Sequence, residues 1–330
     1  MTLSSTELAL IDRWQHDFPF VEQPFAEVGR SVALSEADTI AAFRHLVAQE
    51  VISRIGAVVR PNTIGASTLA AIAVPAARLE EVAGVVSQER LVTHNYEREH
   101  RLNLWFVIAG ADTDSVAATI ARIAARSGLS VLDLPMLRAY HLGLGFGLSE
   151  NGNGRQLPCR ARVVQNYAPQ PIDRALVAAI ENGLPLVAAP YRVVAEEIGT
   201  DPGVVMGRLS GLVDAGVISR FGCVLRHQRL GFDANAMAVW DVADDGIDAV
   251  GERFAGHPKV TLCYQRPRQL PLWPYNLFCM VHARSRAEAS SAIDELNRDV
   301  DAGTVKAHAV LFSTRCFKQR GAVFSRSGRH

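Results

Sequence analysis

Two stretches of this 330-residue chain occur twice, with the copies 166 positions apart. Residues 18–25 read FPFVEQPF, and residues 184–191 read LPLVAAPY. Residues 51–60, VISRIGAVVR, return at 217–226 as VISRFGCVLR, with seven of ten residues identical. A solenoid stacks at least three short repeats, so two long copies predict a duplicated and fused domain instead. Two such halves build one pseudo-symmetric interface, and a single asymmetric pocket can form where they differ.

The composition limits the classes of protein to consider. The length is typical of about two domains or domain pairs. The 34 basic residues balance the 34 acidic ones, so the formal net charge is zero. This balance argues against a protein whose whole surface binds nucleic acid or acidic membranes. All but three of the basic residues are arginine, whose planar guanidinium suits paired recognition of carboxylates and phosphates.

Cysteine spacing and the N-terminal sequence indicate the compartment. The five cysteines show no C-x-x-C spacing, which predicts neither a disulfide framework nor a structural zinc site. Glu7, Asp12 and Arg13 interrupt the apolar stretch that a signal peptide needs, and no run is long enough to span a membrane. We therefore expect a cytoplasmic protein that does not associate with a membrane.

The first segment of each half has the spacing of a helix-turn-helix. In both copies, apolar residues at helical spacing precede a turn, a second helix and a third helix with a polar cap. The first helix should carry Leu8 in one copy and Leu176 in the other, the second should begin near Pro24 and Pro190, and the third should be capped by Ser35 and Asp201. A strand should follow each set, at 53–60 and at 219–226.

The remainder of each half predicts the order strand, helix, strand, strand, helix, strand. In the first half the strands are expected at 67–74, 91–98, 102–109 and 131–138, and the helices at 76–87 and 113–127. In the second half the strands are expected at 234–242, 260–266, 276–283 and 305–313, and the helices at 246–255 and 286–299. Such a βαββαβ unit packs its helices on one face of an antiparallel sheet and leaves the other face for a partner sheet.

The predicted fold is therefore α+β, with a unit of helix-turn-helix followed by a ferredoxin-like βαββαβ domain that occurs twice. The expected boundaries are, in chain order, helix-turn-helix 1–60, ferredoxin-like domain 61–146, linker 147–171, helix-turn-helix 172–226, ferredoxin-like domain 227–318 and tail 319–330. The linker is marked by glycine, asparagine and proline without any hydrophobic period.

The two copies differ most between the second and third strands of each βαββαβ unit. Residues 92–106 read VTHNYEREHRLNLWF, and residues 260–278 read VTLCYQRPRQLPLWPYNLF. When Asn103 is aligned with Asn276, the second hairpin is five residues longer than the first. We expect the function to reside in these two hairpins.

Side chains suited to a polyanionic, aromatic ligand gather in both hairpins. The first carries His94, Tyr96, Arg98, His100 and Trp105, and the second carries Tyr264, Arg266, Arg268, Trp273 and Tyr275. Because alternate residues of a strand point to one side, His94, Tyr96 and Arg98 should share a face, and His100 continues the series if the strand persists. By the same rule Tyr264, Arg266 and Arg268 should share a face.

Two facing sheets would then enclose a cavity lined by imidazole, phenol and guanidinium groups. Arginines hold carboxylates, and aromatic rings cover an apolar ring system, so this cavity suits a large, flat polyanion. A histidine there could act as a general acid near neutral pH, or as an axial ligand to a metal that the ligand carries.

A transcription regulator is the first alternative. The layout of helix-turn-helix and βαββαβ resembles the leucine-responsive regulator (Lrp/AsnC) family over nearly all of both halves. A DNA-reading helix needs positive charge to neutralise phosphates. The first candidate helix sets Glu36 and Asp38 against Arg44, and the second has Arg208 alone. Neither has the basic stripe of a DNA-binding face, so we expect a retained scaffold and no DNA partner.

The hairpin sequences are more specific than the fold. HNYEREH with LNLWF in the first half, and CYQRPR with WPYNLFCMVH in the second, resemble the two subunits of siroheme decarboxylase. From about residue 8 to 317 the chain is similar to the fused NirDL form, which is associated with d1 heme biosynthesis. The resemblance implies conversion of the C12 and C18 acetate groups of siroheme to methyl groups, giving 12,18-didecarboxysiroheme. It also implies that no cofactor is needed beyond the iron of the siroheme substrate.

Site roles follow from this resemblance and from the chemistry of the side chains. Loss of carbon dioxide from a pyrrole acetate leaves a carbanion that a proton must quench, and His94 or His100 would supply it, with Tyr96 and Tyr264 as helpers. One of the two histidines could instead bind the siroheme iron, and no other metal site is expected. The groups expected to hold the remaining carboxylates and the macrocycle are Arg98, Arg266, Arg268, Trp105, Trp273 and Tyr275.

Two alternatives and the state of assembly stay open at this point. The chain could be a regulator of the Lrp/AsnC type, or a siroheme carrier or sensor without catalysis. The two halves should form an internal pseudo-dimer. Further pairing into a homodimer and the participation of pathway partner proteins are both compatible with the sequence.

Overall fold

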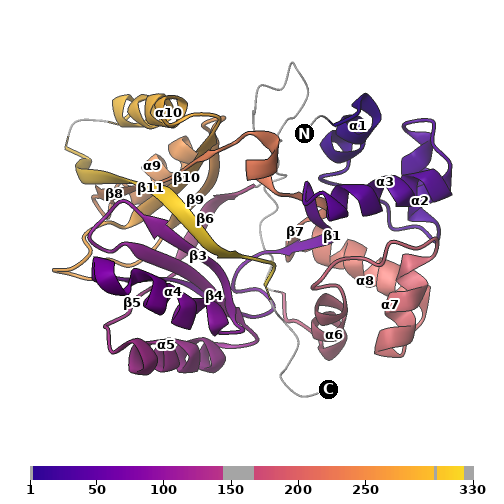
Figure 1. The fold of residues 1–330 in the computed structure, drawn as a ribbon, viewed down its shortest axis with the longest axis horizontal. Helices are drawn as coiled ribbons and strands as arrows, with labels where there is room; N and C mark the ends of the chain where they lie inside the picture. Colours follow the sequence, from indigo (N-terminus) through magenta and orange to yellow (C-terminus); the bar gives the residue numbers. More distant parts are fainter. Residues whose placement is uncertain (1–2, 144–166, 301–302, 323–330) are drawn as a thin grey trace. The chain divides into compact units, whose positions relative to one another are not determined.

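The computed structural model describes residues 3–143, 167–300 and 303–322. The expected linker at 147–171, apart from its last five residues, and the expected tail beyond residue 322 lie outside these residues. The described chain forms two units, and both halves contribute to each (Figure 1). A helical unit contains the two helix-turn-helix segments, and a sheet unit contains the two βαββαβ segments. The chain passes from the first unit to the second after Ile64 and again after Gly231.

In the described part of the helical unit, each half contributes three α-helices and one strand. The first half forms α1 (Ser5–Arg13), α2 (Pro24–Arg30), α3 (Glu36–Ala48) and β1 (Ile52–Val59). The second forms α6 (Pro171–Ala179), α7 (Pro190–Ile198), α8 (Pro202–Asp214), β7 (Ile218–Leu225) and the 3₁₀ turn η2 (His227–Leu230). The expected caps are confirmed, because Ser35 Oγ accepts from the N–H of Asp38 and Asp201 Oδ1 accepts from the N–H of Gly203.

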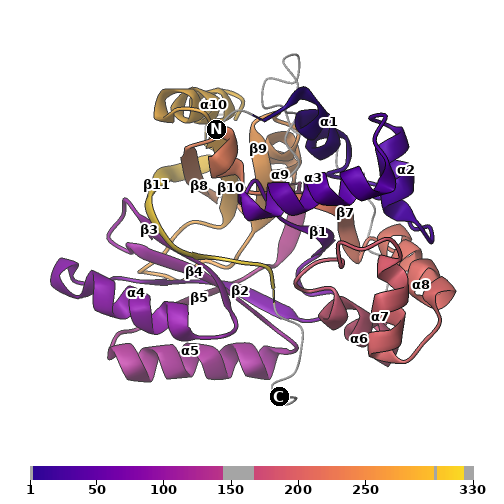
Figure 2. The same ribbon diagram turned by 45° about the vertical axis from the view of Figure 1, so that its right-hand side comes forward.

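The repeated motifs meet across the two halves of this unit. Strands β1 and β7 pair antiparallel, with Gly56 opposite Gly222. Phe18 donates its backbone N–H to the carbonyl of Phe221 at 3.1 Å, and Leu184 donates to the carbonyl of Ile55 at 2.7 Å. Each copy of the first motif therefore binds the strand of the other half, and the three helices of each half lie on either side of the ladder (Figure 2). This reciprocity gives a structural reason for the similarity of the two copies.

The sheet unit has the expected βαββαβ order in both halves. The first half forms β2 (Ala66–Ile72), the 3₁₀ turn η1 (Ala76–Arg78), α4 (Leu79–Gln88), β3 (Val92–Arg98), β4 (Leu104–Gly110), α5 (Thr113–Ser127), β5 (Leu132–Pro135) and β6 (Arg138–Leu142). The second half forms β8 (Ala234–Val242), α9 (Ile247–Ala255), β9 (Val260–Gln265), β10 (Leu277–Ala283), α10 (Arg286–Arg298) and β11 (Val305–Gln319).

The last strand of each half departs from the prediction, because it crosses to the sheet of the other half. The sheet order is β5-β2-β4-β3-β11-β8-β10-β9-β6. The prediction of a single strand at 131–138 is wrong. Strand β5 pairs with β2 and ends at Pro135, and β6 then pairs with β9 of the second half. Proline has no N–H with which to continue a ladder, which accounts for the break. The strand expected at 305–313 continues to Gln319, and its second part pairs with β3 of the first half.

The sheet unit is layered, with two sheet regions face to face and helices outside. Side chains from both halves, among them Leu69, Trp105, Met237 and Phe278, form one hydrophobic cluster between the inner faces. The outer face of the first half packs under α4 and α5, and the outer face of the second packs under α9 and α10 (Figures 1 and 2). The expected pairing of two sheets is therefore confirmed, and the hairpins of both halves contribute to one interior.

The paired glycines of the β1–β7 ladder provide a test of this arrangement. A Cβ added at Gly222 would lie 2.4 Å from the carbonyl oxygen of Trp14, whereas one added at Gly56 would find its nearest neighbour at 3.5 Å. We expect Gly222→Ala to destabilise the fold by about 2 kcal/mol, because the backbone of the preceding turn must move. Gly56→Ala, the matched control, should change stability little. Denaturant midpoints measure both, and equal losses would contradict the assigned packing.

Candidate functional site

The first hairpin presents three expected site residues on the inner face of strand β3. The ring of His94 stacks on that of Tyr96, with centroids 6.3 Å apart and planes 20° apart. The guanidinium of Arg98 lies 5.6 Å from the centre of the Tyr96 ring. Asn95 points the other way and donates to the carbonyl of Ala83 in α4. Strand alternation therefore brings His94, Tyr96 and Arg98 together.

Arg98 is buried, with 6% of its surface exposed. It donates to the carbonyl of Leu311 at 3.0 Å and to Oδ1 of Asn235 at 3.2 Å, both of which are neutral groups. Burial lowers the pKa of Arg98 to about 10, which still leaves it charged at neutral pH. A buried cation that has only neutral hydrogen-bond partners among the described residues is suited to receive a carboxylate.

Arg266 repeats this arrangement in the second half. Its guanidinium donates to the carbonyl of Leu134, lies 4.5 Å from the centre of the Tyr264 ring and has its Nε buried without a hydrogen-bond partner. Burial lowers the pKa of Arg266 as well. Leu134 and Leu311 occupy equivalent positions, since each lies where the last strand still pairs with the first strand of its own βαββαβ unit. The structure therefore contains two pseudo-equivalent buried arginines.

The longer second hairpin brings His100 against an aromatic cluster. The ring of Trp273 lies 5.5 Å from His100, 5.0 Å from Trp105 and 4.9 Å from Tyr275, edge to face in each case. Nδ1 of His100 accepts from the N–H of Leu102 at 3.0 Å. Burial and the neighbouring Arg101 lower the pKa of His100, so this imidazole is neutral at pH 7 with its proton on Nε2.

Arg268 lies apart from the other two arginines. Strand β9 ends at Gln265, so the alternation that would place Arg268 on the face of Arg266 stops before it. Its guanidinium pairs with Asp241 at 2.7 Å and Asp244 at 2.5 Å. These two carboxylates already neutralise the charge of Arg268. The ion pairs link the base of the long hairpin to the end of β8.

The interior between the sheets, expected to be a cavity, is occupied in this structure by side chains of the sheets themselves. Trp105, Tyr264 and Trp273 are buried members of the inter-sheet cluster, and Tyr275 packs against it. Nε1 of Trp273 is buried without a hydrogen-bond partner. An indole N–H left unsatisfied in an apolar interior is costly, so it offers a donor to an incoming polar group. No cluster of three or more metal-ligating side chains occurs within the described residues.

Two residues that were not singled out from the sequence join this site. Asn235 of β8 and His282 of β10 are both buried on the inner face, and Asn235 Nδ2 lies 3.0 Å from His282 Nε2. Each is a buried polar residue in a strand whose other buried residues are apolar. That exception to the apolar pattern could have identified them, but nothing local indicated that they approach Arg98.

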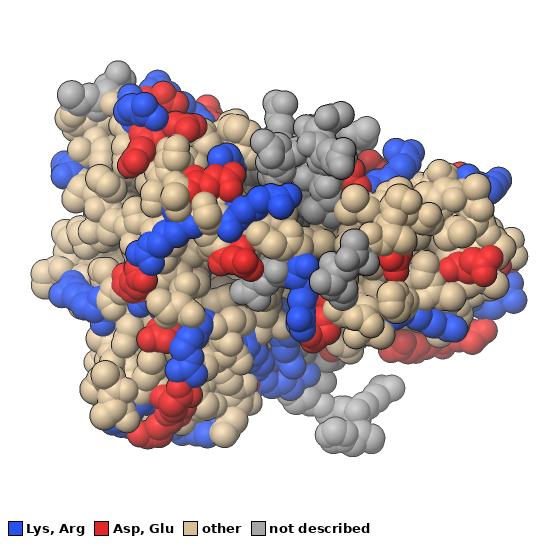
Figure 3. Space-filling model, turned by 45° about the horizontal axis from the view of Figure 1, so that its top comes forward, with Lys and Arg blue, Asp and Glu red and all other residues tan. Residues whose placement is uncertain are grey.

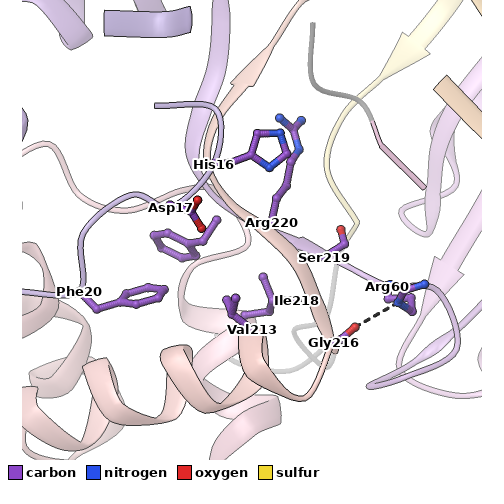
Figure 4. Close-up of a pocket in the computed structure, with 10 residues that line it drawn as sticks. His16, Asp17, Phe20, Arg60, Val213, Gly216, Ile218, Ser219 and Arg220 are labelled. Carbon is purple, nitrogen blue, oxygen red and sulfur yellow. Dashed lines mark hydrogen bonds between the residues drawn. The ribbon is translucent and has the colours of Figure 1, made fainter. Parts of the chain in front are cut away.

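A separate hollow lies in the helical unit, which contains none of the predicted site residues. His16, Asp17, Phe20, Arg60, Ser219 and Arg220 are among the residues that line it (Figure 4). Arg60 donates its Nε–H to the carbonyl of Gly216 at 3.0 Å, and Arg220 donates to the carbonyl of Cys223 at 3.4 Å. Both guanidinium groups thus fasten the backbone around the β1–β7 ladder, and we interpret this hollow as a packing junction.

The helix-turn-helix segments show no basic reading surface on the helices named as candidates. Arg44 of α3 donates to the carbonyl of Leu186 at 2.8 Å, and Arg208 of α8 pairs with the buried Asp173 at 2.6 Å. On the face drawn in Figure 3, basic and acidic side chains lie beside one another. Because Arg44 and Arg208 bind within the unit, they are poorly placed to neutralise phosphates. No helix among the described residues is long and apolar enough to cross a membrane.

Comparisons with known proteins extend over nearly the whole chain. Residues 64–141 and 229–318 match the profile "AsnC-like ligand binding domain", and residues 7–52 and 173–218 match "Siroheme decarboxylase NirDL-like HTH domain". The chain is 41% identical to the siroheme decarboxylase NirDL subunit of Paracoccus denitrificans, over 98% of this chain and 99% of that protein. A siroheme decarboxylase NirL subunit of Stutzerimonas stutzeri is 47% identical over 44% of this chain and 85% of its own length.

Among solved structures, the chain is similar to the siroheme decarboxylase NirDL in co-complex with an iron-uroporphyrin III analogue. The TM-score is 0.68 at 29% identity, and the match covers 97% of this chain and 94% of that one.

His16, which lines the hollow of Figure 4, predicts a pH dependence of stability. Burial and the nearby Arg220 lower its pKa from 6.5 to about 4. The unfolded chain binds a proton near pH 6.5 and the folded chain does not, so stability falls as the pH drops from 6.5 towards 4. Between pH 7 and pH 5 we expect a loss of about 2 kcal/mol that is absent in His16→Gln. Denaturant titrations at both pH values measure it, and identical pH profiles for the two proteins would contradict the assignment.

Proposed function

From the membership of this chain in the siroheme decarboxylase NirDL family, we infer that it is a carboxy-lyase acting on siroheme. We propose that it converts the acetate groups on C12 and C18 to methyl groups, giving 12,18-didecarboxysiroheme for d1 heme biosynthesis. The observation that carries the proposal is the pair of buried arginines, Arg98 and Arg266. Each arginine lies in one of the two hairpins that distinguish the halves, and its guanidinium donates hydrogen bonds to neutral acceptors.

The substrate is a polycarboxylate built on a large conjugated ring. Arg98 and Arg266 would each bind a carboxylate that is retained, because a guanidinium stabilises the anion and so opposes loss of carbon dioxide. Trp105, Trp273 and Tyr275 would contact the macrocycle. The bound iron-uroporphyrin III analogue in the solved relative supports a tetrapyrrole at this fold. Because the interior is packed here, binding requires the long hairpin of Trp273 to move.

The reaction breaks one carbon–carbon bond in each reacting acetate. The bond between the methylene carbon and the carboxylate carbon breaks, carbon dioxide leaves, and the electron pair stays on the methylene carbon, where the conjugated ring delocalises it. A proton then forms the new carbon–hydrogen bond and completes the methyl group. Burial of the reacting acetate away from arginine favours this step, since the charge is more dispersed in the transition state than in the carboxylate.

His94 is the better placed of the two histidines to supply the proton. His100 is neutral at pH 7, and its remaining N–H faces an aromatic cluster, so it is a weak acid. His94 stacks on Tyr96, and burial raises the pKa of Tyr96, so this phenol stays protonated and can donate a hydrogen bond. We therefore assign His94 as the acid with Tyr96 as helper, and give Tyr264 the same helping role at the second site. Arg268 is not assigned a carboxylate, because it pairs with aspartates.

The proposal also covers the assembly of the protein. Relatives of one half occur as separate NirD and NirL subunits, so this chain would supply both halves of one pseudo-dimer. The relatives are themselves named as subunits, which supports the participation of further chains in the complete reaction. We place the reaction in the cytoplasm and expect it to require no cofactor beyond the iron of the substrate.

The activity is tested by anaerobic incubation of the purified chain with siroheme. We expect the product mass to fall by one carbon dioxide for each acetate attacked, and two successive losses would show that both acetates react on this chain. Siroheme that binds but keeps its mass would contradict catalysis by the chain alone; adding the related subunits would then show whether they are needed. Absence of binding would contradict the proposed site.

The role of His94 is tested by His94→Ala, which should lower turnover about 10²-fold, because the proton must then come from water. The control is His308→Ala, since His308 is an exposed residue of β11 away from the hairpins. The visible spectrum of bound siroheme distinguishes the two roles of His94. A shifted spectrum in His94→Ala would indicate an iron ligand, and unchanged turnover would exclude His94 as the acid.

A further inference from the structure

The two buried arginines are held in different ways, although they occupy equivalent positions in the two halves. Both donate to a backbone carbonyl of the other half, of Leu311 or Leu134, which lies just before the last strand crosses over. Arg98 has a second fixed partner, the side chain of Asn235, which belongs to the other half of the chain. In the sheet alignment, Ser67 of β2 occupies the position that corresponds to Asn235, and Ala109 of β4 the position that corresponds to His282. The pair of asparagine and histidine is therefore particular to the Arg98 site.

The orientation of the Asn235 amide follows from its neighbours. An arginine has only donors, so the atom facing Arg98 must be the amide oxygen, which also accepts from Ser313 at 3.4 Å. The amide nitrogen then faces Nε2 of His282 at 3.0 Å and donates to it. Because Nε2 accepts, the proton of a neutral His282 lies on Nδ1.

The chain of hydrogen bonds ends on the backbone. Nδ1 of His282 lies 2.8 Å from Oγ1 of Thr261, which donates to the carbonyl of Met280 at 3.0 Å. Every donor in this series, from Arg98 to Thr261, then has an acceptor. Arg98, Asn235 and His282 are each 6% exposed, so water competes little with these bonds. In an interior of low dielectric, such a satisfied network holds its members in one orientation.

We propose that Asn235 and His282 are positioning residues, which set the plane of the Arg98 guanidinium before a substrate carboxylate arrives; this rests on the proposed function. A guanidinium has five N–H donors, of which Leu311 and Asn235 fix two. The remaining donors point in set directions and can bind a carboxylate without first losing rotational freedom. Tyr264 of its own hairpin is instead a side-chain partner of Arg266, so the two arginines are oriented by different groups, and this difference determines which way round the macrocycle binds.

Substitution of Asn235 by aspartate separates this role from a structural one. Asparagine and aspartate have nearly the same shape, and Nε2 of His282 can carry the proton that the carboxylate then accepts. The carboxylate would form an ion pair with Arg98 and compete with the substrate. We expect Asn235→Asp to keep its thermal midpoint and to raise the siroheme KM at least about tenfold. We expect the kcat at saturation to change less than the KM. Asn62→Asp makes the same change of charge at an exposed position of the helical unit and is the control.

His282 is tested by whether a conservative change restores binding. His282→Leu removes the acceptor for the Asn235 amide and should raise the siroheme KM about three- to tenfold. His282→Gln keeps an acceptor near the position of Nε2 and should restore most of the affinity. A purely structural residue would instead change the thermal midpoint and the KM together. The inference is overturned if wild type turns over siroheme while Asn235→Asp and His282→Leu match its KM. If wild type itself neither binds nor converts siroheme, the proposed function fails instead.

Discussion

The exchange of the last strands between the halves is the interaction on which the rest of the sheet unit depends. Strand β11 leaves β8 to pair with β3, and β6 pairs with β9 after the break at Pro135. Just before each last strand crosses to the other half, it presents a backbone carbonyl, of Leu311 or Leu134, to the buried arginine of the other half's hairpin. Without such acceptors a buried guanidinium would be costly, because the desolvation of an ion in a protein interior costs several kcal/mol. Strand exchange thus makes two cationic positions possible inside an otherwise apolar core.

In the helical unit, too, each half binds a strand of the other half. Phe18 binds the strand of the second half, and Leu184 binds the strand of the first. These contacts involve the two motifs that are most alike in the two copies, and the arginines of α3 and α8 bind within the unit. The arrangement that the two copies share therefore maintains the pairing of the halves. The proposed site lies in the sheet unit, where the copies have diverged.

The sequence differences between the two copies make the surroundings of Arg98 and Arg266 unequal. The first hairpin contributes His94 and His100, and the second is longer and places Trp273 against His100. Asn235 and His282 hold Arg98, whereas the corresponding positions beside Arg266 are Ser67 and Ala109. A pseudo-symmetric protein that acts on an asymmetric macrocycle needs such a difference, because equal sites could not distinguish its side chains.

The sequence by itself determined the duplication, the helix caps at Ser35 and Asp201, and the face shared by His94, Tyr96 and Arg98. The duplication is read directly from the two copies, and the caps and the shared face depend on capping and periodicity, which act within a few residues. Only the tertiary structure decided the strand exchange, the pairing of Arg268 with two aspartates, and the approach of Asn235 and His282 to Arg98. Periodicity specifies which face a side chain takes but not which distant strand lies opposite. That register is set by packing and hydrogen bonding between segments more than a hundred residues apart, about which a local pattern carries no information.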